Sequence, residues 1–400
     1  MKKYKLIIIG FGVSGICCSS ISKQHNLDFC VLEQNNTFGG IWNFSLKTSR
    51  LQTHKTYYEF PDYKMDYNCD NYPDKQTMLS YFNKYINHHK LEKNVFYNTK
   101  VLNIVYNHKN KIWIIATTNN GICNEYNSEY ICISSGYNFH PNIPNNLKQL
   151  FFTESKIISN IKTYHSKELY KIDLSKEFTN KNVVIIGNGA SACDILGVIS
   201  KYTNDLYVLY NSNKYYINKT ICGVSLSIIL NKMVLYFFKN LNVKIYVLLF
   251  TIFNALFFNN YLDLPNSRVN SKNLIASTII SKLINDKKLF YIKDSFKHTI
   301  DNNVILENSV LFNIDIIILA TGYKSITNFK FEYNINCDKY YNIILPENIY
   351  CGIIGFSPSY NWLITSYRQS QFFIEHITKN DTKNTKNTKN TKNTKNTKFI

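Results

Sequence analysis

The chain has 400 residues, 45% of them hydrophobic, and carries a formal net charge of +19. This is long enough for two or three domains, and the apolar fraction is that of a globular protein that buries real cores. No basic cluster is interleaved with base-stacking aromatic residues, so no nucleic-acid partner is expected. Six lysines lie in a Thr-Lys-Asn repeat at 382–398, which leaves +13 on the rest of the chain.

The ten cysteines are scattered, with no CxxC and no zinc spacing. They are interpreted as reduced packing residues, and no metal site is predicted. The N-terminal run MKKYKLIIIG is too short for a signal peptide and continues into a glycine motif. The sequence therefore predicts a cytoplasmic protein.

The first structural unit is KLIIIGFGVSGICCSSISKQHNLDFCVLEQ at 5–34. A continuous apolar run predicts a central parallel strand, which Gly10, Gly12 and Gly15 follow as a GxGxxG turn. Glycine is needed there for tight bending, for close approach to a pyrophosphate and for helix packing. Ser14 lies in the same turn, and Glu33 follows about 20 residues on, where a carboxylate can accept the ribose hydroxyls. The unit predicts a dinucleotide site.

A double glycine comes next, in FGGIWN, with Gly40 followed by Trp42. Glycine lets the chain pass close to the flavin end of a dinucleotide, and the indole can pack on it. The order of GxGxxG, acidic residue and GGxW resembles the flavin-containing monooxygenases, whose first Rossmann domain binds FAD. The resemblance implies an oxidoreductase similar to N,N-dimethylaniline monooxygenase.

The segment LQTHKTYYEFPDY at 51–63 is similar to the one in which that family carries an Asn beside the flavin. Gln52 takes this position and Thr53 follows it, so the resemblance implies that Gln52 is catalytic and that both residues contact cofactor. A solvent-facing loop Gln is the alternative. Asn98–Asn107 and Lys111–Thr118 predict a β-hairpin, and Glu129–Ser134 predicts a strand that ends at Gly136, a further cofactor-binding candidate.

The linker pattern of the family, FxGxxxHxxx followed by Tyr or Phe, matches poorly. His165 fits the histidine, but Ser159 and Ile161 replace the Phe and Gly. A structural role as a cap or packing residue is the alternative for His165. No Trp follows it, which argues against the Baeyer–Villiger relatives.

A second copy of the unit, NVVIIGNGASACDILGVISKYTNDLYVLYNS, begins at residue 182. Its turn GNGASA resembles the GxGxSA by which the family binds NADPH, and the binding candidates in it are Gly187, Gly189, Ser191 and Ala192. No acid lies at 206–214, so a 2′-phosphate would not be repelled there. The arginine usual in the family is missing, and Ser212 and Lys214 are the best candidates to replace it.

Apolar runs at 226–238 and 245–258 are each shorter than the roughly 18 to 20 residues of a spanning helix. They predict buried helices or a substrate-tunnel wall, with contact to a membrane surface as the alternative. The later strand DIIILATGY resembles the segment whose Thr321 and Gly322 return the chain to FAD.

The predicted fold is α/β, with two Rossmann-like dinucleotide-binding domains, the NADPH domain inserted into the FAD domain. Residues 1–165 and 312–379 are assigned to the FAD domain and 166–311 to the NADPH domain with its apolar helical insert. The repeat at 380–400 predicts a disordered tail.

The resemblance implies an FAD- and NADPH-dependent monooxygenase that transfers one oxygen of O2 to a soft nitrogen or sulfur of a small apolar substrate, through a flavin C4a-hydroperoxide. A pyridine-nucleotide disulfide reductase would need a redox CxxC, which the chain lacks. A degenerate dinucleotide-binding flavoprotein, or an uncoupled NADPH oxidase, remains an alternative because of the altered linker, the missing arginine and Gln52.

Overall fold

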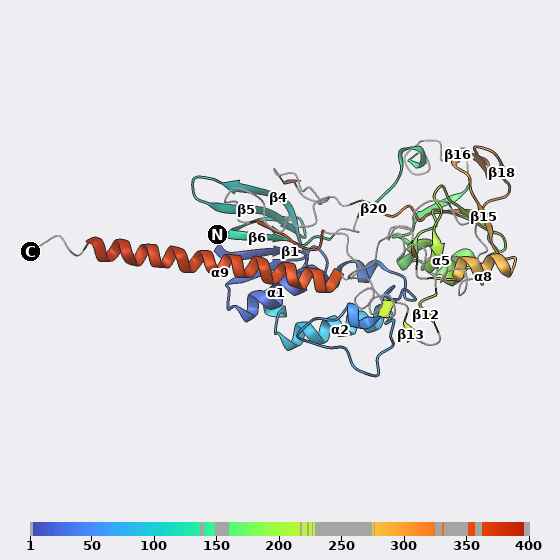
Figure 1. The fold of residues 1–400 in the computed structure, drawn as a ribbon. Coiled ribbons are helices and arrows are strands. Elements are labelled where there is room, and N and C mark those ends of the chain that lie inside the picture. Colours follow the sequence, from blue (N-terminus) through green and yellow to red (C-terminus); the bar gives the residue numbers. More distant parts are fainter. Residues whose placement is uncertain are drawn as a thin grey trace, which may run out of the picture.

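The protein is described by a computed structural model that covers residues 3–136, 140–148, 160–216, 218–221, 224–225, 227–228, 274–275, 277–324, 330–331, 351–356 and 362–395. These ranges form two α/β units, each built around a largely parallel sheet (Figure 1). The apolar runs predicted at 226–238 and 245–258 lie almost entirely outside the described residues.

The first sheet has the strand order β21-β4-β5-β6-β1-β2-β3, and β22 pairs with β6. Its strands are β1 (Lys3–Ile9), β2 (Phe29–Leu32), β3 (Val95–Phe96), β4 (Thr99–Asn107), β5 (Ile112–Asn119), β6 (Ile122–Ile133), β21 (Lys330–Phe331) and β22 (Cys351–Ile353). Strand β1 lies parallel to both β2 and β6, and β4 pairs antiparallel with β5 as the sequence predicts. The buried apolar residues of β1 explain its central place.

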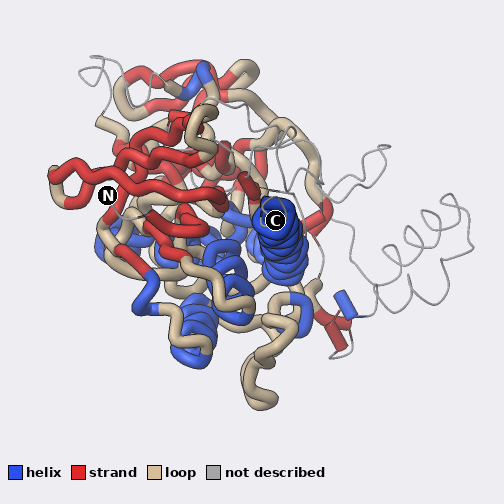
Figure 2. Tube along the Cα trace, turned by 90° about the vertical axis from the view of Figure 1, so that its left-hand side faces the viewer, coloured by secondary structure: helices blue, strands red, loops and turns tan. Residues whose placement is uncertain are grey.

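Helices α1 (Val13–Gln24), α2 (Lys75–His88) and α9 (Trp362–Lys395) accompany this sheet. Helix α9 comes from the end of the chain and runs beside α1 (Figure 1), and Figure 2 views α9 nearly end-on. The core between the helices includes Ile16, Phe82 and Phe373, and the ring of Phe60 stacks on that of Tyr85 with 3.6 Å between centroids. Each such buried side chain contributes roughly 1.5–3 kcal/mol to folding.

The second sheet is wholly parallel, in the order β15-β10-β9-β19-β8. Its strands are β8 (Lys162–His165), β9 (Val183–Ile186), β10 (Leu206–Leu209), β15 (Phe290–Ile292) and β19 (Ile316–Leu319), and its helices are α4 (Leu174–Phe178), α5 (Ala190–Ile199) and α8 (Ile279–Asn285). A small antiparallel sheet of β16 (Phe296–Ile300), β17 (Asn303–Leu306) and β18 (Val310–Leu311) adjoins it. The two glycine motifs therefore begin at the ends of β1 and β9, one in each sheet.

Short elements complete the described chain. They are β7 (His140–Pro141), β11 (Tyr215–Tyr216), β12 (Thr220–Ile221), β13 (Val224–Ser225), β14 (Leu274–Ile275) and β20 (Tyr323–Lys324), with 3-10 helices η1 (Gly40–Phe44), η2 (Lys55–Tyr57), η3 (Glu92–Asn94), η4 (Asn145–Leu147) and η6 (Leu169–Lys171).

The domain boundaries differ from those predicted. Strands β8 and β19, assigned from the sequence to the first domain through the boundaries at 165 and 312, both belong to the second sheet. Ile316 pairs with Val183 on one side and with Lys162 on the other. The sequence of a short strand carries no local signal of which sheet it joins, so the sequence alone does not fix these boundaries. The chain leaves the second sheet after Leu319 and returns to the first through β21, β22 and α9.

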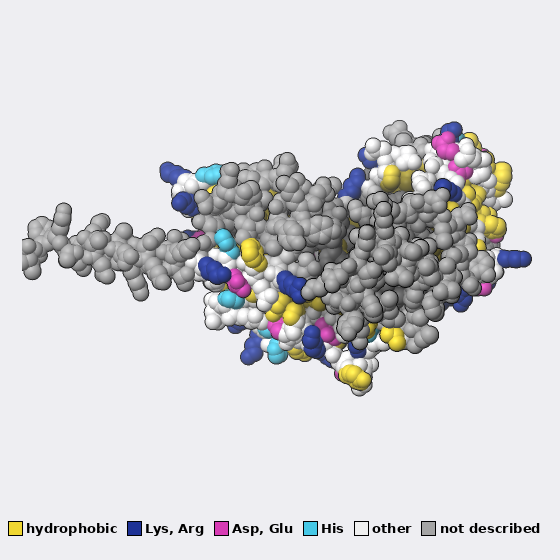
Figure 3. Space-filling model, in the orientation of Figure 1, with side chains coloured by type: hydrophobic (Ala, Val, Ile, Leu, Met, Phe, Trp, Pro, Cys, Tyr) yellow, Lys and Arg dark blue, Asp and Glu magenta, His cyan; other side chains and the backbone are white. Residues whose placement is uncertain are grey.

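The C-terminal repeat also differs from its prediction. Helix α9 continues to Lys395, so the structure has helix over 380–395 where a disordered tail was predicted. Extension of a helix that is already packed needs no new nucleus, which is the costly step of helix formation. Within the described residues, no helix combines the length and the apolar character that crossing a membrane requires. On the face drawn in Figure 3, the visible Lys and Arg side chains are scattered rather than gathered in one patch.

Candidate dinucleotide sites

The first glycine turn has a separate steric reason for each glycine. Gly10 has φ +99°, and a Cβ there would lie 2.8 Å from the Ser134 carbonyl oxygen. A Cβ on Gly15 would lie 1.9 Å from the Gly10 carbonyl oxygen, so this glycine lets the helix pack on the turn. A Cβ on Gly12 would meet its nearest neighbour, the Cα of Gly40, at an ordinary 3.5 Å. The protein itself does not require glycine at position 12, which leaves close approach of a ligand as the reason.

Helix α1 begins directly after this turn with Gly12 as its N-cap. No side chain caps its first turn, and no acidic residue lies there. Free N–H groups and the positive end of the helix dipole therefore face the same space as Gly12. A dinucleotide pyrophosphate fits such a helix end.

Glu33 follows β2 and lies at the edge of this space. Its Oε2 accepts a hydrogen bond from the Phe11 N–H at 2.7 Å, and its Oε1 accepts from the backbone and side-chain N–H groups of Asn35 at 2.9 and 2.7 Å. Burial raises the pKa of Glu33, while these hydrogen bonds oppose the rise. The carboxylate is thus held in a fixed place that suits the ribose hydroxyls.

A pocket brings most of the predicted FAD residues together. Seven of the sequence-predicted residues line it: Gly10, Gly12, Ser14, Glu33, Gly40, Trp42 and Gly136. Gly15 lies beneath the turn, where it contacts Gly10. Trp42 is buried, and its ring makes edge contacts with Tyr58 and Phe82 at 6.2 and 6.4 Å. Glu33 and the glycine turn thus share one pocket, as the sequence predicts for a bound dinucleotide.

Several further residues line this pocket that the sequence did not predict, among them Tyr58, Ser135, Gly355, Trp362 and Ser366. Ser366, on α9, shares a 3.0 Å hydrogen bond with Ser14 through their hydroxyls. A Cβ on Gly355 would lie 2.0 Å from the Ser14 Oγ, so only glycine fits there. The GIIGF sequence at 352–356 carried this signal, although its contact with the first turn is not local. Ser135 Oγ is buried without a hydrogen-bond partner among the described residues, so it is available to a ligand.

The second glycine turn repeats the geometry of the first. Gly187 has φ +109°, and a Cβ there would lie 2.5 Å from the Ala320 carbonyl oxygen. A Cβ on Gly189 would meet nothing within 4 Å. Gly189 is the N-cap of α5, whose first turn holds Ser191, and it has neither a capping side chain nor an acidic residue there. Ala192 is fully buried in the helix, at the position that Gly15 has in the first copy.

The loop after β10 lies next to this turn. Asn188 joins them, because its Nδ2 donates to the Ser212 carbonyl at 2.9 Å and to the Tyr291 hydroxyl at 2.7 Å. Its own carbonyl accepts from the Tyr216 hydroxyl at 2.9 Å. Lys214 is half-buried in the same loop, and burial lowers its pKa. The structure thus places Ser212 next to the second turn, and Lys214 follows in the same loop.

Gln52 and Thr53 lie outside the first pocket, in an irregular segment between Leu51 and η2. The Gln52 Oε1 is buried and has no hydrogen-bond partner among the described residues. A buried carboxamide acceptor without a partner is costly, which points to a donor outside the described residues, such as a bound ligand.

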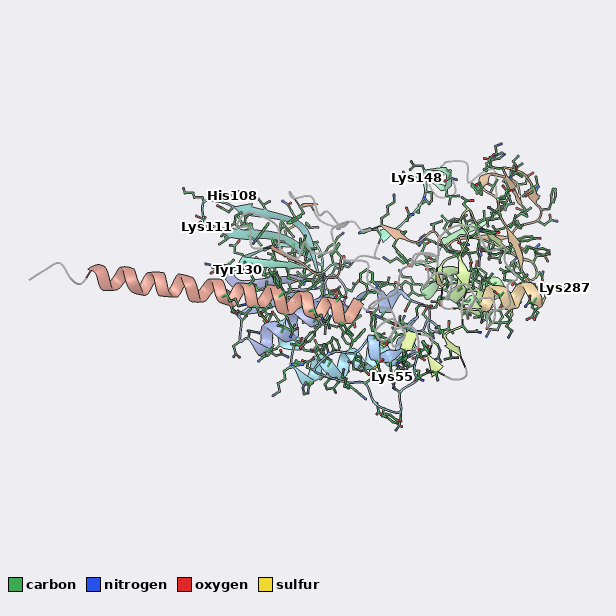
Figure 4. The ribbon with its side chains drawn as sticks, in the orientation of Figure 1. Lys55, His108, Lys111, Tyr130, Lys148 and Lys287 are labelled. Carbon is green, nitrogen blue, oxygen red and sulfur yellow. The ribbon has the colours of Figure 1, made fainter. Side chains whose placement is uncertain are left out.

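Lys55 anchors this segment from within the first unit, on the side that faces the second unit in Figure 4. The side chain is buried, and its Nζ donates to the carbonyls of Asp66, Tyr67 and Cys69 at 3.2, 3.0 and 2.5 Å. This ammonium ties the Gln52 segment to the loop before α2.

Thr321 and Gly322 do not line the first pocket, where the resemblance placed them. They follow β19 at the crossover between the units, where the Thr321 hydroxyl donates to the Asn142 carbonyl and the Asn142 N–H donates to the Gly322 carbonyl. Their strand belongs to the second sheet, which is the reason for the difference. His165 ends β8 nearby; it is buried, and its Nδ1 accepts from the Lys167 N–H at 3.2 Å.

Two sheets, one largely and one wholly parallel, that each present a glycine turn and an uncapped helix N-terminus define a protein with two dinucleotide sites. This agrees with the predicted α/β fold class of two Rossmann-like units. The model of the flavin-binding monooxygenase-like family matches residues 3–354, so the chain belongs to that family.

Individual relatives are distant. Flavin-containing monooxygenase 1 of Mus musculus is 23% identical over 337 residues, which cover 80% of this chain and 62% of that protein. The probable indole-3-pyruvate monooxygenase YUCCA10 of Arabidopsis thaliana is 20% identical, over 88% of this chain and 92% of that protein. The chain thus spans less than two thirds of the length of the mouse enzyme.

Solved structures show the same fold. An oxidized steroid monooxygenase bound to NADP matches with a TM-score of 0.71 and 13% identity, over 96% of this chain and 86% of that chain. The OTEMO complex with FAD and NADP matches with a TM-score of 0.72 and 14% identity, over 95% of this chain and 85% of that chain.

Proposed function

We propose that the protein is an FAD- and NADPH-dependent monooxygenase. FAD would bind at Gly10, Gly12, Ser14, Gly15 and Glu33, and NADPH at Gly187, Gly189, Ser191, Ser212 and Lys214. The observation that carries this proposal concerns the middle glycine of each turn, Gly12 in the first and Gly189 in the second. A Cβ at either position would meet no obstacle among the described residues, so the protein fold itself does not require glycine there.

When bound, the flavin supplies the redox and oxygen chemistry, and the protein supplies binding, orientation and exclusion of water. The proposed reaction consumes one NADPH, one proton and one O2, adds one oxygen atom to a nitrogen or sulfur of the substrate and releases one water. The free buried Oε1 of Gln52 supports a role for this residue as an acceptor toward a cofactor amide.

The experiment measures three quantities on purified, FAD-loaded protein: NADPH oxidised, O2 consumed and N-oxide formed from N,N-dimethylaniline, or sulfoxide formed from thioanisole. Equal amounts of the three are expected. Hydrogen peroxide in place of oxygenated product would instead identify an uncoupled NADPH oxidase. Absence of both flavin binding and NADPH consumption would leave a degenerate member of the family.

The disulfide reductase alternative has no support in the structure. None of the eight described cysteines is joined to another in a disulfide. Cys17 and Cys132 are fully buried, and burial raises the pKa of both thiols, which disfavours the reactive thiolate.

A further inference from the structure

Polar side chains of the second unit reach across to the segment that carries Gln52. Lys219, just before β12, donates from its Nζ to the Leu51 carbonyl at 2.9 Å. Leu51 directly precedes Gln52, so this ammonium holds the peptide group next to the carboxamide. Figure 1 shows β12 and β13 between the two units, close to α2.

Asp194 makes a second bond across the same boundary. It lies on α5, the helix that begins at the second glycine turn, and its Oδ2 accepts from the Ser49 hydroxyl at 3.0 Å. Burial raises the pKa of Asp194 and lowers that of Lys219, and the charge of each residue opposes the shift of the other. Two charges removed from water in this way depend on each other, and removing one partner leaves the other uncompensated.

The backbone that follows Gln52 is also bound by residues of the second unit. Ser227 accepts from the His54 N–H at 3.2 Å, and its hydroxyl lies 2.8 Å from that of Ser225. The Tyr72 hydroxyl lies 2.7 Å from the Ser225 hydroxyl and donates to the Lys219 carbonyl at 2.5 Å. Residues of the second unit therefore bind the backbone both before and after Gln52.

We propose that Lys219 is a positioning residue for Gln52, and that Lys219 and Asp194 together make the segment 49–57 respond to a nucleotide bound at the second glycine turn. The first half concerns the protein alone, and the second half rests on the proposed NADPH site. Helix α5 connects the two sites, because the second glycine turn lies at its N-terminus and Asp194 lies in its second helical turn. A shift of the helix end on nucleotide binding is passed to Ser49 through its hydrogen bond with Asp194. It is passed to Leu51 through Lys219, whose ammonium interacts with the charge of Asp194.

The first experiment measures amide hydrogen exchange of the peptide 49–57 in FAD-loaded protein without NADP+. Lys219→Met should speed exchange about tenfold, as expected for the loss of one hydrogen bond to a charged group. Lys219→Arg, which keeps the charge and an N–H donor, should restore slow exchange. Lys201→Met is the matched control. Lys201 is an exposed lysine of the same unit, and its Nζ lies over the ring of Tyr202. Unchanged exchange in Lys219→Met would overturn the positioning role.

The second experiment repeats the measurement with NADP+ and follows the visible flavin spectrum. NADP+ should slow exchange at 49–57 and perturb the spectrum in the native protein, and both effects should be lost in Lys219→Met and in Asp194→Asn. By reciprocity, the affinity for NADP+ should fall by the same factor as the lost protection. Full protection by NADP+ in both variants would overturn the coupling.

Ser49→Ala covers the case in which a charge variant does not fold, because it removes the hydroxyl bonded to Asp194 and leaves both charges in place. It should lose part of the NADP+ response, and a full response would count against the coupling. If the native protein binds no NADP+, the proposed function fails at the second site. The first experiment still decides the role of Lys219 in that case, so the two failures are distinguishable.

Discussion

Gly12→Ala offers a direct test of the first dinucleotide site, because the structure separates its effect on the ligand from its effect on the protein. Gly12 has φ −77°, which any residue adopts, and the added methyl group meets the Gly40 Cα at 3.5 Å. Alanine is a poorer N-cap than glycine by a few tenths to about 1 kcal/mol. It also restricts the unfolded chain by about 0.4–1 kcal/mol, which offsets that loss. The free energy of unfolding of the FAD-free protein should therefore change by less than about 1 kcal/mol.

The effect on FAD should be much larger. The methyl group points into the space where the pyrophosphate must approach, and forcing extra volume into a packed contact costs typically 1–3 kcal/mol. FAD affinity should fall roughly 5- to 150-fold. Titration of the FAD-free protein with FAD, followed by fluorescence quenching, measures this affinity, and thermal unfolding of the same protein measures stability.

Gly189→Ala is the matched control at the second site, where the added Cβ has no neighbour within 4 Å. It should weaken NADP+ binding and leave FAD affinity unchanged. Gly10→Ala should instead destabilise the protein itself, because φ is +99° and the Cβ would lie 2.8 Å from a carbonyl oxygen. Unchanged FAD affinity in Gly12→Ala, with the protein folded, would refute the assignment of the first turn.

Three further outcomes are expected. Lys214→Glu should raise the KM for NADPH about tenfold and change the KM for NADH little, because the new carboxylate repels the 2′-phosphate that NADH lacks. Steady-state kinetics with both cofactors measures the two values, and an equal rise for both would contradict the prediction. Gln52→Asn restores the residue that the family carries at this position and should lower the hydrogen peroxide released per NADPH consumed. The reason is that a misplaced hydrogen-bond donor costs roughly 10²–10³-fold in rate. Unchanged or greater release of peroxide would mean that Gln52 does not face the flavin. Partial burial acts to raise the pKa of Asp62, but the His89 imidazole 3.4 Å away and a hydrogen bond from the Tyr85 hydroxyl hold it down at about 2. The resulting stability is present above the unfolded-state pKa of 3.8 and is lost as the pH falls toward 2. Asp62→Asn should therefore cost about 1 kcal/mol at pH 7, after a discount for solvent exposure, and denaturant titrations should find this cost gone at pH 2.

Contiguous residues determined the parts of this protein that the sequence predicted well. A strand, a glycine turn and a helix follow one another within about 20 residues, and a Cβ on Gly15 would clash with the Gly10 carbonyl of the same turn. The acidic residue at the end of the second strand is fixed by the same local geometry. Glu33 therefore lies in the predicted pocket, and Lys214 lies in the loop next to the second turn.

Contacts between distant residues were decided by the tertiary structure alone. Strand β19 pairs with β9 and with β8 in the second sheet, and the sequences of these short strands do not encode that pairing. Ser366 meets Ser14 across 352 positions of sequence, and Lys219 meets Leu51 across 168. Hydrogen bonds of this kind depend on how two folded units pack together, and no pattern within either segment specifies the partner.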